Sequence, residues 1–149
     1  WLLDGDPASV YASATPGHTD LQIVLRYPDG STAAITYATS GNAGFPKETI
    51  DVVADGKILR FDDFQRASLY ARKRWSSPRI RRGRDKGQRA ELDAFLNAVS
   101  SGGPMPVPIE SLVATTLATL AVHTSLATGA PIRLEVPTAT APSPSGMPT

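Results

Sequence analysis

The sequence contains no cysteine, and this absence excludes both a disulfide framework and a thiolate nucleophile. It also permits a cytoplasmic location, which is the location we expect. No run of 18 apolar residues occurs, so the sequence predicts no membrane-spanning segment. Its 15 basic and 14 acidic residues leave a net charge of +1, which gives no overall electrostatic reason to expect binding to nucleic acid or to a membrane.

Short catalytic motifs are absent as well. The sequence has no G-x-G-x-x-G and no P-loop, so it has no recognisable cradle for nucleotide phosphates. It has neither the H-E-x-x-H of zinc proteases nor the G-x-S-x-G of serine hydrolases. The chain begins with "WLLDGDPASV", without a methionine or a signal-peptide pattern, and we expect it to be a piece of a longer protein.

The first half of the chain has the pattern of antiparallel strands. With 149 residues, 41% of them hydrophobic, the chain is long enough for one domain with an ordinary core. Apolar and polar residues alternate in the best of these stretches, which is typical of a half-buried strand. "YPDGS" and "ADG" predict hairpin turns, because glycine allows a positive φ there. The predicted strands are 9–15, 20–27, 32–39, 48–54, 57–61 and 67–75, with a last one at 131–136.

The second half changes to a helical period. Apolar residues at i, i+3, i+4 and i+7 predict a helix over 86–103, and a broader apolar side predicts another over 108–129. The uncharged Pro/Ser/Thr-rich stretch 137–149 predicts a flexible tail after a folded region 1–136.

This order of elements predicts an α+β fold, a mostly antiparallel, open-faced sheet covered on one face by two helices. The other face, on which we place Ile35 and Tyr37, would be open and would need a partner, for example a second copy of the chain.

Lys47 and Glu48 are the first candidates for chemistry. Adjacent side chains on a strand point to opposite faces, so the two cannot act together as one acid/base pair. Lys47 is therefore a candidate ligand contact, and the alternative is an ordinary strand residue with no functional role.

We predict no metal site. No D-x-D-x-D-G spacing surrounds Asp62 and Asp63, and an aspartate after a strand commonly caps the next turn. The two histidines, His18 in a loop and His123 in mid-helix, lack the spacing of a metal-binding pair.

The segment 72–89 is the most unusual in composition. It holds nine of the fifteen Lys and Arg residues, with Asp85 as its single acid. Such a run can bind an anion or nucleic acid. However, Pro78 and Gly83 interrupt it and Trp75 is its one aromatic residue, so we expect a solvated surface segment that does not bind nucleic acid.

Three stretches, taken in order, resemble a known family. They are "YPDGSTAAITYAT", "FPKETIDVVADGKILRFDDF" and "DKGQRAELDAFLNAVSSGGPMPVPIESLVATTLATLAVHTSLATGAPIRL". Together they resemble the C-terminal domain of the Gfo/Idh/MocA (glucose-fructose oxidoreductase/inositol dehydrogenase) family, over residues 8 to 136. The match is closest to a two-part subgroup in which this module follows a zinc-type alcohol-dehydrogenase-like module.

The resemblance implies that NAD or NADP is bound by an N-terminal Rossmann domain that is missing from this chain. The catalytic lysine of the family lies in a Glu-Lys-Pro motif of that domain, and "PKE" here is not that motif. The resemblance therefore implies no catalytic residue and no cofactor site in this chain. Tyr37, Asn42, Lys47 and Lys86 are the candidate substrate-binding residues.

The sequence thus predicts a substrate-binding and oligomerisation domain of an NAD(P)-dependent oxidoreductase that acts on a sugar- or cyclitol-like alcohol. Its expected partners are the missing Rossmann domain, a small-molecule substrate, and another copy of the chain through the open sheet face. The alternative is a non-catalytic interaction module whose basic loop 72–89 binds an anionic polymer or a partner protein. A dinucleotide fingerprint encoded upstream of Trp1 would distinguish the two.

Overall fold

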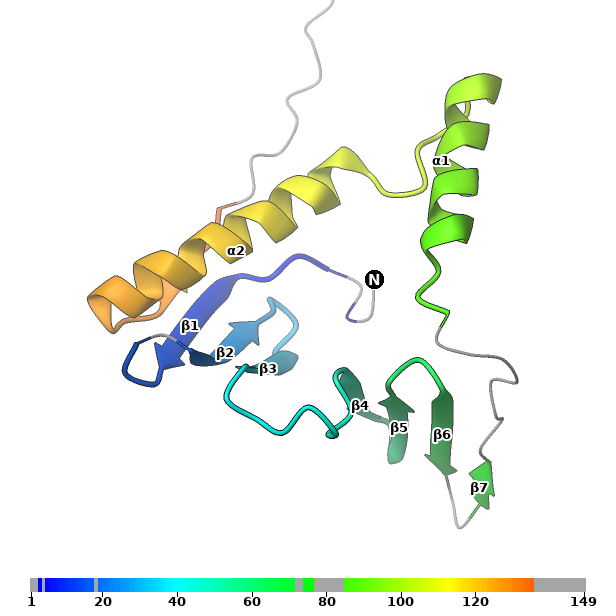
Figure 1. Cartoon of the computed structure of the whole chain (residues 1–149). Helices are drawn as coiled ribbons and strands as arrows, with labels where there is room; N and C mark the ends of the chain where they lie inside the picture. The colour runs from blue at the N-terminus through cyan, green and yellow to red at the C-terminus, as the bar shows by residue number, and fades with distance from the viewer. Residues whose placement is uncertain (1–2, 4, 18, 72–73, 77–84, 136–149) are drawn as a thin grey trace, which may run out of the picture. The chain divides into compact units, whose positions relative to one another are not determined.

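The computed structural model describes residues 3, 5–17, 19–71, 74–76 and 85–135, with the side chains of 74–76 left out (Figure 1). Its contacts divide the chain into two compact units, 1–40 with 107–149, and 41–106. The elements are β1 (Ser9–Ala14), β2 (Asp20–Arg26), β3 (Thr32–Ala38), β4 (Thr49–Ala54), β5 (Lys57–Asp62), β6 (Arg66–Ala71), β7 (Arg74–Ser76), α1 (Gln88–Ser101), α2 (Ile109–Thr128) and β8 (Ile132–Arg133).

The first unit holds a four-stranded sheet in the order β3-β2-β1-β8. All neighbouring strands are antiparallel, with Val10 paired to Leu25 and Ala12 to Ile23. The turn between β2 and β3 is the predicted hairpin, in which Gly30 has φ 88° and donates its N–H to the Tyr27 carbonyl at 3.1 Å.

Helix α2 packs against β1 and β8 and covers one face of this sheet. Its small buried residues Ala118, Ala121 and Ser125 recur every three or four positions, so they form one face and allow a close approach to the strand. Val10 is fully buried at the centre of this contact. The partly buried residues around it are Ile23, Leu25, Val122, Ile132 and Leu134.

The strand register corrects the placement of Ile35 and Tyr37. Ile35 is paired with Ile23, and Tyr37 with Leu21. Directly paired residues point to the same side of an antiparallel sheet. Because Ile23 packs into the core beneath α2, Ile35 and Tyr37 project from the helix-covered face and not from the open one. They are 45% and 58% exposed, so they lie outside the main core.

The second unit holds a separate four-stranded antiparallel sheet in the order β4-β5-β6-β7. The β4–β5 turn has Asp55 at φ 50° and Gly56 at φ 68°, the two positive φ angles of a type I′ hairpin. The single strand expected over 67–75 is wrong, because β6 and β7 are two antiparallel strands. One face of this sheet is apolar, and Ile50, Leu59 and Leu69 on it are each about 40% exposed.

Helix α1 belongs to the second unit and is bounded by two glycines with positive φ, Gly87 at 76° and Gly102 at 65°. Its predicted apolar stripe forms, but the four side chains are about half exposed or more. These are Leu92, Phe95, Leu96 and Val99.

The α+β class with open antiparallel sheets is confirmed. The strands that we expected in one sheet form two sheets. In the described part of the chain, α2 is the helix that packs on the first sheet. Of the helices in the described part, α2 is the one long and apolar enough to cross a membrane by length and composition. Core helices of water-soluble proteins meet the same criterion, and α2 packs on a sheet, so this is weak evidence for a span.

Candidate substrate-binding residues

Lys86, one of the four candidates, belongs to a cluster in the second unit. Its ammonium lies 2.6 Å from Glu48 Oε1 and 5.2 Å from the centre of the Phe64 ring. Three segments thus meet at this lysine: the residue before β4, the β5–β6 turn, and the residues before α1. Both side chains of the ion pair remain about 40% exposed, so the pair contributes little to stability and is open to a ligand.

The turn beneath Lys86 has an unusual backbone. Asp63 and Phe64 both lie in the left-handed region, at φ 47° and 56°, and the Gln65 N–H donates to the Asp62 carbonyl at 2.9 Å. Aspartate tolerates this region, but a bulky phenylalanine does so at a cost. The Phe64 ring packs edge to face on Phe61, with centroids 5.0 Å apart, and accepts the Lys86 cation on its face. These contacts offset the strain.

Glu48 is held in place by its backbone as well as by its side chain. Its carbonyl accepts a hydrogen bond from the Asp63 N–H at 2.7 Å, which ties the start of β4 to the same turn. Its Oε2 is buried and has no hydrogen-bond partner among the residues that the structure describes. A carboxylate with an unused acceptor beside an ammonium and an aromatic ring can recognise a hydroxyl-bearing ligand once the side chain turns outward.

The other three candidates are placed differently. Lys47 precedes β4, so the expectation that it lies within a strand is wrong, and its side chain is exposed. Asn42 accepts a hydrogen bond from the Gly44 N–H at 2.8 Å through Oδ1, which closes a local turn. Tyr37 belongs to the first unit, whereas Asn42, Lys47 and Lys86 belong to the second.

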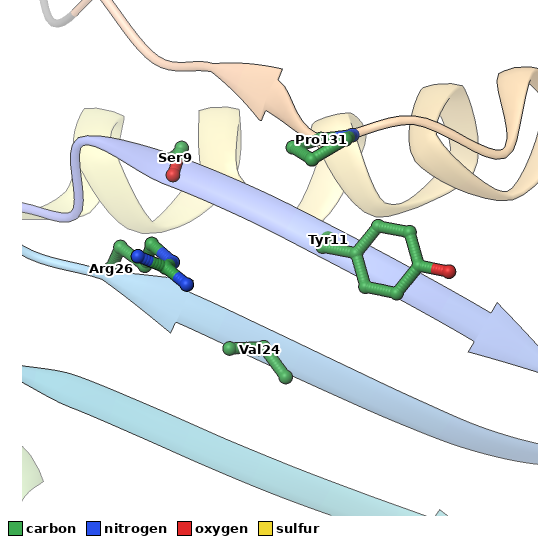
Figure 2. Close-up of a pocket in the computed structure, with 5 residues that line it drawn as sticks. All are labelled: Ser9, Tyr11, Val24, Arg26 and Pro131. Carbon is green, nitrogen blue, oxygen red and sulfur yellow. The ribbon is translucent and has the colours of Figure 1, made fainter.

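A hollow of about 360 Å³ lies on the open face of the first sheet (Figure 2). It is lined by Ser9, Tyr11, Val24, Arg26 and Pro131. Val24 is paired with Tyr11, and Arg26 with Ser9, so these four side chains point to the side opposite the core. Apolar and polar residues alternate in 20–27, which is consistent with Arg26 on the side opposite the core, but nothing in the sequence indicates that Pro131 lies beside it.

The remaining expectations concern metal ions and the basic segment. Within the described ranges, no group of three or more His, Asp or Glu side chains converges as a metal site. Of the segment 72–89, residues 72–73 and 77–84 lie outside the described residues, as does His18. The surface role of this segment stays a prediction.

Comparisons with known proteins identify the fold. No family model and no curated protein matches the sequence. Among solved structures, a levoglucosan dehydrogenase in complex with NADH and levoglucosan matches 89% of this chain, with a TM-score of 0.72 and 13% identity. Aldose-aldose oxidoreductase from Caulobacter crescentus, complexed with glycerol, matches 87% with a TM-score of 0.69 and 16% identity. An oxidoreductase from Agrobacterium radiobacter, in complex with NAD+, L-tartaric acid and magnesium, matches 87% with a TM-score of 0.68 and 18% identity.

The chain has the fold of one part of these oxidoreductases. It spans less than half of their length, 46%, 42% and 44% respectively. At such low identity the likeness establishes the fold alone. It supports the resemblance to the Gfo/Idh/MocA family, while the two-part arrangement with a zinc-type module stays a prediction.

Proposed function

We propose that this chain is the substrate-binding and oligomerisation domain of an NAD(P)-dependent oxidoreductase that acts on a sugar- or cyclitol-like alcohol. The observation that carries the proposal is the match of 87–89% of the chain to part of the three oxidoreductases above. By their names, two of these proteins act on an aldose or on levoglucosan, and two were solved with NAD+ or NADH.

The dinucleotide would be bound elsewhere in the protein. The sequence lacks the glycine-rich turn that such a cofactor requires, and more than half of each neighbour's length has no counterpart in this chain. We propose that the remainder is an N-terminal Rossmann domain that supplies NAD or NADP and the catalytic residues, and that this chain is inactive without it. A zinc-type dehydrogenase-like module would precede it in the two-part arrangement.

Lys86 and Glu48 are the residues that we assign to the substrate. Sugars and cyclitols present rows of hydroxyl groups, each both a donor and an acceptor. Lys86 Nζ can donate to such a hydroxyl, and Glu48, with an acceptor oxygen to spare, can accept from the next one. The role of the pair is to bind and orient the alcohol, not to transfer its proton or hydride.

The test is to express the complete coding sequence to which this chain belongs and to screen sugars and cyclitols for NAD+ or NADP+ reduction. We expect turnover with at least one polyol in the complete protein, and none with residues 1–149 alone. A complete protein that has no dinucleotide-binding segment upstream of this chain would contradict the proposal.

A further inference from the structure

We propose that the hollow on the open face of the first sheet binds a small carboxylate with a flat apolar body, for which benzoate serves as the probe. Arg26 and Ser9 would hold the carboxylate group, and the rest of the hollow would hold the body. These residues belong to the first unit, whereas Lys86 and Glu48 belong to the second. The inference therefore goes beyond the proposed polyol site and does not depend on it.

Two arginines and a serine form one row across this face. Ser9 of β1 is paired with Arg26 of β2 on one side and with Arg133 of β8 on the other. The next residues, Val10 and Ile132, pack in the core, so the row itself lies on the opposite side of the sheet. Since neighbouring strands are about 4.8 Å apart, the two arginine backbones are about 10 Å apart with Ser9 midway. An anion above Ser9 would thus lie between two guanidinium groups.

The two guanidinium groups have no partners in the part of the chain that the structure describes. Neither arginine side chain forms an ion pair or a hydrogen bond there, although Glu135 follows Arg133 by only two positions. The carboxylate of Asp29, in the turn after β2, accepts the N–H and the hydroxyl of Ser31 instead. Like charges this close repel each other, and an anion bound between them is attracted by both.

The hollow beside this row is too large and too apolar for an inorganic ion alone. Its volume of about 360 Å³ is within the range of roughly 300–1,000 Å³ that small-molecule sites occupy. Tyr11, Val24 and Pro131 line it next to Ser9 and Arg26, on the side of the sheet turned away from α2 (Figure 2). The Tyr11 side chain is 40% exposed, so its ring offers a surface on which a flat ligand can stack.

These features together favour a carboxylate over a neutral ligand. A guanidinium presents its donors as a planar fork that matches the two oxygens of a carboxylate, and the Ser9 hydroxyl can donate to the same group. Arg133, on the other side of Ser9, would add a longer-range attraction that salt weakens. The site is open to water and benzoate is small, so we expect a Kd on the order of 1 mM.

The test begins with saturation-transfer NMR on the complete protein to which this chain belongs, with benzoate as the observed ligand. Benzamide has the same shape without the charge, and we expect its Kd to be at least about tenfold higher. Inorganic phosphate, compared with chloride at equal ionic strength, should not displace benzoate, because it leaves the apolar walls uncovered. Equal binding of benzoate and benzamide, or displacement of benzoate by equimolar phosphate, would overturn the proposal.

Two variants that remove the same charge locate the binding. Arg26→Gln should raise the Kd for benzoate about tenfold, because it removes the fork that holds the carboxylate. Arg89→Gln, on a 95% exposed side chain of α1 in the other unit, should leave this Kd unchanged. Both changes are on exposed side chains, so melting temperatures should match the wild type. An Arg26→Gln variant that binds benzoate like Arg89→Gln would contradict the assignment.

Titrations at two protein concentrations separate this site from one that needs a second copy of the chain. One copy supplies every residue named here, so the Kd should not change with protein concentration. A Kd that falls as the protein concentration rises would contradict the proposal. Binding is measured without dinucleotide or polyol, so a complete protein that binds benzoate but lacks dehydrogenase activity would refute the proposed function alone. Active protein that fails to bind benzoate would refute this site alone.

Discussion

The Lys86 ammonium lies 2.6 Å from Glu48 Oε1 and faces the ring of Phe64, so a cation, a carboxylate and an aromatic ring from three segments form one cluster. The pair is exposed and contributes only about 0–1 kcal/mol to stability. Its value for recognition is larger, because a hydrogen bond from a charged donor to a ligand hydroxyl contributes about 1.5–3 kcal/mol.

Lys86→Met should therefore weaken substrate binding in the complete protein. We expect KM for the preferred polyol to rise by about tenfold or more, with kcat changed much less, because the lost contact binds the ground state and the transition state alike. Lys57→Met, which removes an exposed lysine from β5, is the matched control and should leave KM unchanged. Equal KM values for the two variants would remove Lys86 from the substrate site.

Ser125→Ala should destabilise the first unit. The Ser125 hydroxyl is fully buried, accepts the Ala12 N–H at 2.9 Å and donates to the Ala130 carbonyl at 2.8 Å. Its removal leaves a donor and an acceptor without partners where β1 extends beyond β8, at a cost of about 1–3 kcal/mol. Urea denaturation measures this loss. Ser100→Ala in α1, whose hydroxyl donates within the described residues to the Leu96 and Asn97 carbonyls of its own helix, should change stability by less than about 0.5 kcal/mol.

Gly56→Ala tests the hairpin between β4 and β5. Gly56 has φ 68°, and nothing lies within 4 Å of an added Cβ, so the effect comes from the backbone alone. We expect a loss of about 1–2 kcal/mol, because alanine is strained in the left-handed region. Gly41→Ala also meets open space but has no positive φ in that region, so it should be neutral or slightly stabilising. Similar melting temperatures for the two variants would contradict the assigned turn.

Much of this architecture was predictable because it rests on local rules. The Asp-Gly and Pro-Asp-Gly turns need positive φ at their glycines, and the spacing of Leu92, Phe95 and Val99 fits only a helix. The placement of Tyr37 was wrong because alternation gives the two faces of a strand but not which of them is covered. The pairing of Tyr37 with Leu21 shows that Tyr37 lies on the covered face, and this pairing depends on the register of the partner strand.

The candidate site was only partly predictable for the same reason. Lys86 and Glu48 are 38 positions apart, and their contact lies beside the β5–β6 turn, which places the Phe64 ring next to Lys86. The left-handed Asp63–Phe64 pair lacks the glycine that would have marked such a turn in the sequence. Strain at a position without glycine is visible only in the structure.

Acid should weaken the attachment of Asp20 to the end of β3. The Ser40 hydroxyl, followed by the Ser40 and Thr39 N–H groups, lowers the pKa of Asp20 below its ordinary value of 3.8. Because the pKa of Asp20 is lower in the folded state, the hydrogen bonds to its carboxylate stabilise the fold fully at pH values above the ordinary pKa. This stabilisation is lost as the pH falls through the lower pKa of the folded state. Asp20→Asn should therefore be less stable than the wild type at neutral pH, and the difference should vanish in acid. A difference in melting temperature that is constant from neutral to low pH would contradict this assignment.

The measurement that tests the central claim most directly is a pair of titrations with NAD+ and NADP+ by calorimetry, on residues 1–149 and on the complete protein, followed by a polyol turnover assay of both. We predict no dinucleotide binding and no turnover for this chain, and both for the complete protein. Tight dinucleotide binding by residues 1–149 alone, or a complete protein that binds neither dinucleotide, would contradict the assignment of this chain as the substrate-binding domain of an oxidoreductase.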